Sequence, residues 1–188
     1  DRARVSADFY TSDDRVNGQT RGISLAPGVG VPRPPKPDTL LNPDWAFVET
    51  RDKGAMIRGE FDINDQLMAY AALGTSESKY KYNGSISALV LNSAGDFRTT
   101  IGQLAFDVKK ESGELGLKGQ FATGAGKHQW SMKYTHYEHR QNDYGGRSVP
   151  GADWTTNIYD PVWGPAAPFI TPHISRTGVQ LKSYGIAD

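Results

Sequence analysis

The sequence predicts an all-β protein, an antiparallel meander of about six long strands that forms part of a transmembrane β-barrel. Two stretches, from Gly54 to Gly74 and from Glu114 to Tyr137, alternate apolar and polar side chains around a tight turn. Short turns also alternate with much longer connections along the chain, which is typical of strands that cross an outer membrane repeatedly.

Composition narrows the possible classes of protein. The chain has 188 residues, with 21 Lys and Arg against 21 Asp and Glu, and the mixed charges do not favour a nucleic-acid surface. It has no cysteine, which excludes disulfides and thiolate chemistry. No apolar run approaches the ~18 residues that a membrane helix needs, but a membrane strand shows lipid only every second side chain. Both ends fall within alternating sequence, so we interpret the chain as a segment of a longer protein.

The first strand is predicted from Arg2 to Arg21. Its apolar face carries Ala3, Val5, Ala7 and Phe9, and it becomes polar from Thr11 onward, as a strand does where it leaves a bilayer. A loop from Ala26 to Pro43 follows and contains PGVGVPRPPKP. Such a run could bind an SH3-type groove, but the flanking strands favour a stiff surface loop.

The second strand is predicted from Trp45 to Asp62 and the third from Gln66 to Tyr82, joined by the turn Asp62–Asp65. One face of this hairpin is apolar and carries Ala55, Ile57, Gly59, Phe61, Leu67, Ala69, Ala71 and Leu73. We expect Asn83 to Thr100 to be a long connection with some strand character.

The fourth strand is predicted from Ile101 to Phe121 and the fifth from His128 to Asp143. Phe121 and Trp130 stand beside the intervening turn, Ala122–Lys127, where aromatic rings suit the headgroup level of a membrane. A long loop from Tyr144 to His173 and a sixth strand from Ile174 complete the chain. The strands are about 20 residues long where soluble strands average about 5–6, so they would rise well above the membrane.

Three stretches resemble a known family. They are ETRDKGAMIRGEFDINDQLMAYAALGTSESKYKYNGS, FDVKKESGELGLKGQFATGAGKHQWSMKYTHYEHRQNDY and NIYDPVWGPAAPF. Their patterns and order are similar to those of TonB-dependent ferric-siderophore receptors, close to the ferrichrome-receptor branch. The resemblance implies a barrel of about 22 strands preceded by a plug domain. Residues 1–188 would then be part of the barrel domain, with the plug and the remaining strands outside this chain.

Tyr80 and Tyr82 are the candidate ligand-binding residues. Counting along the third strand, both share the face opposite Leu73, so they point into the lumen near its outer mouth if the leucine face meets lipid. The resemblance implies the same role, since ferrichrome-type receptors carry a Tyr-x-Tyr pair at about this place that contacts the siderophore. Such rings suit an uncharged or weakly charged chelate. The alternative is that both tyrosines pack loops together.

Other residues carry weaker signals. Four aromatic residues of the last long loop could touch ligand, although packing within the loop is the favoured interpretation: Trp154, Tyr159, Trp163 and Phe169. His136 and His139 are three apart on one strand, so they project to opposite faces and cannot share a metal. We find no hydrolase, kinase or dinucleotide motif and predict no enzyme and no metal site. Five residues are expected to line the lumen wall: Arg58, Glu60, Glu114, Lys118 and Lys133.

The resemblance thus implies an outer-membrane receptor and transporter of ferric siderophores in a bacterium. Its partners would be a ferric siderophore, membrane lipid and, through the plug, TonB; the siderophore is transported ligand, and no resident cofactor or nucleic acid is expected. A soluble lipocalin-like carrier and a diffusion porin are the alternatives. Long loops disfavour the carrier, and a porin would not be expected to share these segments.

Overall fold

The computed structural model describes residues 2–19, 21–145, 153–166, 168–169 and 172–188, and this part of the chain is all β. Six strands are long: β1 (Ala3–Asn17), β3 (Phe47–Asn64), β4 (Leu67–Val90), β5 (Asp96–Thr123), β6 (Gly126–Tyr144) and β8 (His173–Ala187). Two are short: β2 (Ser24–Leu25) and β7 (Asp153–Asn157). None of the described segments is a helix of the length and apolarity needed to span a membrane.

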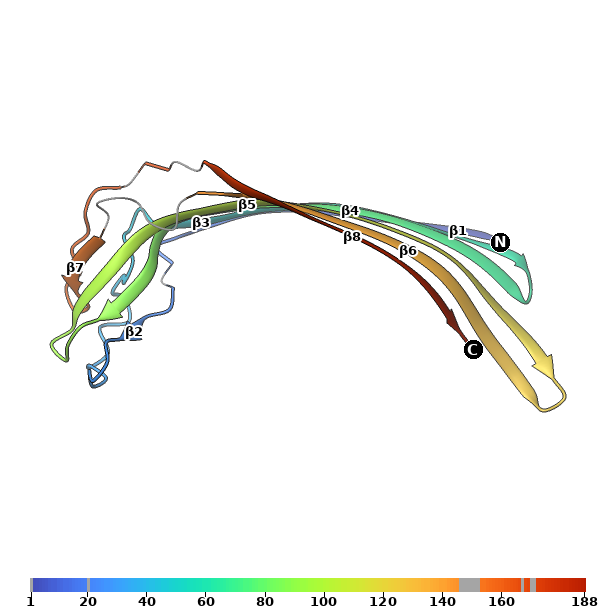
Figure 1. Ribbon diagram of the computed structural model, residues 1–188, viewed down its shortest axis with the longest axis horizontal. Helices are drawn as coiled ribbons and strands as arrows, with labels where there is room; N and C mark the ends of the chain where they lie inside the picture. The colour runs from blue at the N-terminus through green and yellow to red at the C-terminus, as the bar shows by residue number, and fades with distance from the viewer. Residues whose placement is uncertain (1, 20, 146–152, 167, 170–171) are drawn as a thin grey trace.

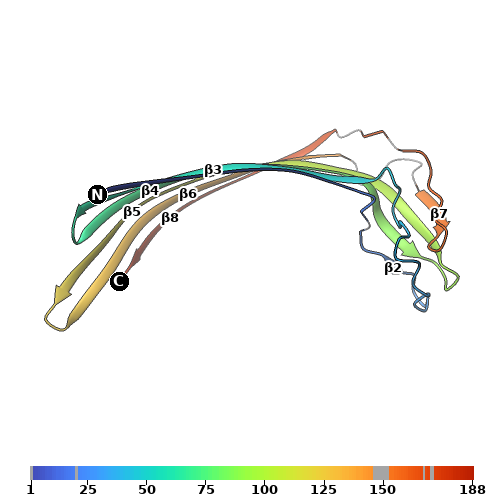
Figure 2. The same ribbon diagram turned by 180° about the vertical axis from the view of Figure 1, so that it is seen from behind.

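The long strands form one curved antiparallel sheet in the order β1-β3-β4-β5-β6-β8 (Figure 1). Both chain ends and the β3–β4 and β5–β6 turns lie at one end of this sheet, which we call the turn end. The β4–β5 turn, β2 and β7 lie at the other end, the loop end, and the view from behind shows the same division (Figure 2). The predicted meander is confirmed.

The predicted hairpins are confirmed in register. Phe61 pairs with Ala69 across β3 and β4, and Glu114 pairs with Thr135 across β5 and β6. Only two residues lie between β3 and β4 and only two between β5 and β6, the length at which a tight turn fixes the register of a hairpin.

Pairing across the sheet aligns the apolar positions into rows. One row at the turn end runs through Ala3, Phe61, Ala69, Leu117, Met132 and Ile186, and the next through Val5, Gly59, Ala71, Leu115, Tyr134 and Tyr184. Since side chains alternate between faces, the opposite face of these strands carries the charged residues. We call these two sides the apolar face and the charged face.

The expected connection from Asn83 to Thr100 is wrong. Strand β4 continues to Val90 and β5 already begins at Asp96. Asn83-Gly84-Ser85 has the composition of a turn, but β4 continues to pair with β5 through these residues. The pairing register shifts only between Ser85 and Ser87. The ladder persists because apolar side chains beyond this point pack into a small core, described below.

The long loops also contain order that the sequence did not predict. Strand β2 pairs with the end of β4 and β7 with the start of β5. The first strand ends at Asn17 rather than Arg21, because Gly18 takes a positive φ of 65° and donates its N–H to Ala46 O at 2.7 Å. That bond closes the base of the first loop, residues 18–46.

Candidate functional site

Apart from Tyr70, the buried apolar side chains of the described residues gather toward the loop end. Phe97, Ile101 and Tyr82 are completely buried, and Val90 and Ile158 nearly so. Leu41 and Trp163 pack against the cluster that Val90, Phe97 and Ile158 form with Ala88. The loop end is therefore a packed unit that can hold side chains in fixed positions.

Tyr80 and Tyr82 occupy different environments on β4. Tyr80 is half-buried and stacks on Phe106 of the neighbouring strand, with ring centroids 4.8 Å apart. Tyr82 has no exposed surface, and its hydroxyl donates to Ser85 O at 2.5 Å. Burial raises the pKa of Tyr82, so the hydroxyl remains a neutral donor. In this structure Tyr80 therefore has surface to offer a ligand, whereas Tyr82 is enclosed.

Asn42 joins the base of the first loop to β4. This side chain is completely buried; its amide donates to Gln19 O at 2.5 Å and lies 3.5 Å from the Tyr82 hydroxyl. Its oxygen accepts the Ser85 N–H at 2.9 Å. A Cβ at Gly84 would lie 3.0 Å or less from Asn42, Tyr82 and Ala46, so only glycine allows the loop so close. We call Asn42, Tyr82, Gly84 and Ser85 the loop clamp.

Aromatic side chains tie the last long loop to the first. Trp154 meets both Trp45 and Trp163 edge-on, and the indole N–H of Trp45 donates to Gly164 O at 3.0 Å. Tyr159 donates its hydroxyl to Arg33 O at 2.9 Å. Phe169 packs on Phe47, with centroids 5.6 Å apart. All four loop aromatics therefore pack against other side chains or backbone of the loop end, as the favoured interpretation expects.

Arg21 is a residue that sequence reasoning missed. Its guanidinium carbon lies 4.8 Å from the centre of the Tyr82 ring, a cation–π contact, and its side chain is exposed. No local pattern distinguishes Arg21 from the other charges of its polar stretch. Its partner is 61 positions away in the chain, and only the fold brings the two together.

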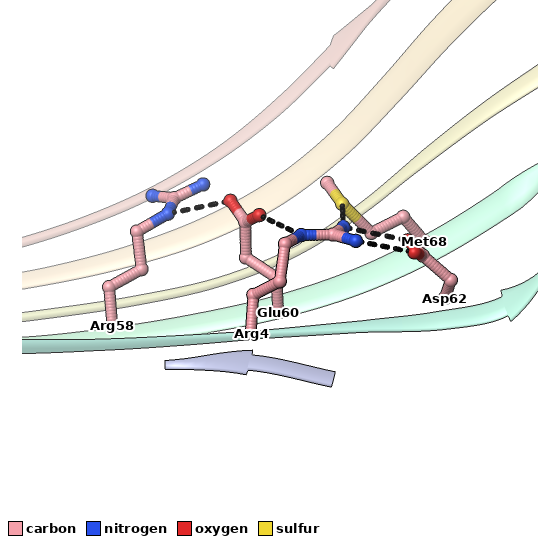
Figure 3. Close-up of polar contacts among 5 residues, drawn as sticks. All are labelled: Arg4, Arg58, Glu60, Asp62 and Met68. Atoms are coloured by element: carbon pink, nitrogen blue, oxygen red, sulfur yellow. Dashed lines mark hydrogen bonds and ion pairs between the residues drawn. The ribbon is translucent and has the colours of Figure 1, made fainter. Parts of the chain in front are cut away.

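The charged face at the turn end carries the residues predicted for the lumen wall. Figure 3 shows Arg4 of β1 between two carboxylates of β3, 3.1 Å from Glu60 and 2.6 Å from Asp62, with Arg58 3.0 Å from Glu60. Farther across the sheet, Arg58 and Lys118 both lie over the ring of Tyr70, and Lys133 approaches Glu114 at 3.9 Å. The five predicted residues share this face. The Arg4 side chain is 48% exposed, so its ion pairs contribute little stability.

His136 and His139 project from opposite faces of the sheet. His136 pairs with Gly113, in a row that includes Leu73 of the apolar face, whereas His139 pairs with Lys110. The two therefore lie on opposite faces, as predicted. In the described part of the chain, no group of three or more His, Cys, Asp or Glu could hold a metal ion.

The chain is similar to known receptors in both sequence and structure. No protein-family model matches the chain. The ferrichrome receptor FcuA of Yersinia enterocolitica is 23% identical over 163 residues, which is 86% of this chain and 21% of FcuA. The structure of BauA, the ferric preacinetobactin receptor of Acinetobacter baumannii, matches with a TM-score of 0.92 and 51% identity, over 98% of this chain and 28% of BauA.

Two further solved structures share the fold at lower identity. The siderophore receptor PiuA of Acinetobacter baumannii matches with a TM-score of 0.72 at 16% identity, over 98% of this chain and 30% of PiuA. The ferric-catecholate import receptor Fiu of E. coli K12 matches with a TM-score of 0.65 at 18% identity, over 98% of this chain and 31% of Fiu. The chain thus spans between a fifth and a third of each protein that it matches. The homologues and structural neighbours are TonB-dependent siderophore receptors of the outer membrane, and this chain corresponds to a segment of their β-barrel.

Proposed function

We propose that this chain is part of the barrel wall and the ligand-capturing loops of an outer-membrane importer of ferric siderophores. The likeness to BauA carries the proposal, with 51% identity over 98% of this chain. The structure supports it through two features. The paired apolar rows at the turn end suit lipid contact, and the packed loop end presents aromatic side chains at the opposite end of the sheet.

Residues 1–188 act as part of the barrel domain, and the plug and further strands are supplied by other parts of the receptor. Import would then draw its energy from TonB through the plug. The chain performs no catalysis and needs no resident cofactor, because the ferric siderophore is the cargo. Among the ligands of the matched receptors, ferric preacinetobactin is the first candidate and ferrichrome the second.

Tyr80 contacts the siderophore, and Tyr82 acts through the loop clamp rather than through direct contact. The exposed surface of Tyr80 and its stacked partner Phe106 support this assignment. Stacked rings offer a broad apolar surface with little conformational freedom to lose, and the tyrosine adds a hydroxyl donor. A buried Tyr82 instead fixes the position of the chain around it.

Replacing Tyr80 by alanine in the full-length receptor tests this proposal. Binding of ferric preacinetobactin and ferrichrome would be measured by quenching of intrinsic fluorescence, and the better ligand used for the comparison. We expect Tyr80→Ala to weaken binding by about 2 kcal/mol, the usual loss for an aromatic hot spot. Tyr10→Ala is the matched control, because Tyr10 lies on the same face nearer the turn end and has exposed ring surface.

Two outcomes would count against the proposal in different ways. Equal binding by the wild type and Tyr80→Ala would return Tyr80 to a packing role. A wild-type receptor that binds no ferric chelate, in a membrane or in detergent, would reject the importer itself.

A further inference from the structure

Arg21 is exposed at the loop end, yet it is held in place. Its guanidinium lies over the ring of Tyr82, and Tyr82 is fixed by the hydrogen bond to Ser85 O and the nearby Asn42 amide. A flexible surface arginine loses side-chain entropy when it binds a ligand. Stacking on a fixed ring removes part of that cost in advance.

The stacked arrangement leaves the donors of Arg21 available. A guanidinium that lies over a ring uses its flat face, whereas its five N–H donors project from its edge. Arg21 forms no ion pair with any residue that the structure describes. Most other arginines of the described sheet, by contrast, have carboxylate partners, including Arg4, Arg15, Arg51, Arg58 and Arg140.

Arg21 also lies close to the proposed ligand contact. Tyr80 precedes Tyr82 by two residues on β4, so the two side chains project from the same face of that strand. Arg21 approaches that face from the first loop, whose base the loop clamp holds against β4. A cation and an aromatic surface are thus neighbours at the loop end, each beside Tyr82.

We propose that Arg21 binds the ligand directly and that the receptor therefore selects ferric chelates with net negative charge. This inference rests on the proposed function, and it names the class of siderophore. The paired N–H donors of a guanidinium match the adjacent oxygens of a catecholate or a carboxylate, and such charge-assisted bonds are the strong ones. The tyrosines alone would have suited an uncharged chelate, so the guanidinium changes the expected preference.

Two ferric chelates of known net charge test whether Arg21 makes the receptor prefer negatively charged ligands. A ferric tris-hydroxamate is neutral, because three single negative charges balance iron(III). A ferric tris-catecholate carries three excess negative charges, because each catecholate supplies two. Dissociation constants for both would be measured on the full-length receptor in detergent, at low and at high sodium chloride.

We expect Arg21→Gln to weaken binding of the tris-catecholate by about tenfold or more while changing that of the tris-hydroxamate less than about twofold. Arg21→Lys should recover part of the loss, since it restores charge without the planar donors. Raising the salt concentration should weaken catecholate binding more in the wild type than in Arg21→Gln, because salt screens the charge interaction with Arg21, which the variant lacks. Arg33→Gln is the matched control, an exposed arginine of the same loop.

Removing the ring beneath Arg21 provides a second readout. Tyr82→Leu also removes the hydroxyl of the loop clamp, so it should weaken binding of both probes, but that of the tris-catecholate more. In the double variant the extra loss for the tris-catecholate should be little larger than in either single variant, because that part of the loss comes from one contact. Equal losses for both probes in Arg21→Gln would make the residue structural and overturn the inference. So would a wild-type preference for the neutral chelate, or a catecholate affinity that Arg21→Gln leaves unchanged. Failure of the wild type to bind either chelate would instead reject the proposed function.

Discussion

The two ends of the sheet bury their apolar side chains in different ways. At the loop end, Phe97 and Ile101 have no exposed surface, because the chain's own loops cover them. At the turn end, Val5 is 74% exposed and Leu73 is 64% exposed, although both belong to regular strands. Tyr70 is an exception there, since it is buried beneath Arg58 on the charged face.

The contrast shows that one sheet can satisfy two different surroundings. Side chains that alternate along a strand can bury only one face, and a single sheet without a covering layer leaves that face open. At the turn end the missing layer is external to the chain, and lipid is the apolar phase that fits. At the loop end, residues from the two long loops supply it instead.

The largest expected effect concerns the chain studied alone. In buffer without detergent, the 188-residue chain should oligomerise or aggregate. Its apolar face would associate with that of other copies, and the unpaired edges of β1 and β8 would hydrogen-bond to further strands. Sedimentation velocity measures this directly. A sharp monomer boundary with cooperative thermal unfolding would show that the turn end buries its own apolar face, and would favour the soluble carrier.

Truncating one apolar residue at each end tests the contrast within the full-length receptor. Phe97→Ala should destabilise the loop end by about 3–5 kcal/mol, because the cavity lies in a packed core. Leu73→Ala should cost less than about 1 kcal/mol in lipid or detergent, because acyl chains fill the space. Thermal unfolding in detergent, with proteolysis of the loops as a local probe, would compare the two variants. Similar losses of stability would show that the two ends of the sheet do not differ in how their apolar side chains are buried.

Glycine substitutions give a finer comparison. An alanine at Gly84 would place its Cβ 2.9 Å from that of Ala46 and within 3.0 Å of Asn42 and Tyr82, so the loop clamp must open. We expect a loss of about 1–3 kcal/mol, as for other overpacked sites. Gly59→Ala at the turn end is the control, since its Cβ would meet nothing within 4 Å. If both variants unfold alike, the close packing of the first loop does not contribute to stability.

The smallest effect is a pH dependence confined to the loop end. Hydrogen bonds from Asn92 and then Asn157 hold the pKa of Asp96 below its usual range. Stability from this carboxylate is therefore present above about pH 4 and is lost as the pH falls through the lowered pKa. Proteolysis at the β4–β5 turn should rise slightly in acid, and Asp96→Asn should abolish that rise. An unchanged acid response in Asp96→Asn would assign it to another group.

Much of the turn end could be predicted from the sequence, because local rules determine it. A period of two and a tight turn specify which residues pair, and the pairing of Glu114 with Thr135 follows from them. The same alternation placed Lys118 and Arg58 on the charged face. Periodicity alone was sufficient there because no distant segment competes for these strands.

The loop end could not be predicted in the same way, because its order depends on partners far apart in the chain. Asn42 bonds to Ser85, 43 positions later, and no local pattern marks either residue. The composition of Asn83-Gly84-Ser85 even favours a turn, whereas tertiary contacts extend the strand through it. Tyr82 has the predicted position on its face, but its burial depends on a loop whose path the sequence does not reveal.

The order of the strands bears on how the molecule acquires its structure. Each long strand pairs with the long strand that comes next in the sequence, so the sheet can grow one strand at a time as successive hairpins close. Hairpins with two-residue turns close small loops and lose little chain entropy on closing. Strands β2 and β7 need β4 and β5 in place before they can pair, so they can join only after the central hairpin exists. The proposed ligand site at the loop end would therefore be assembled after the wall that carries it.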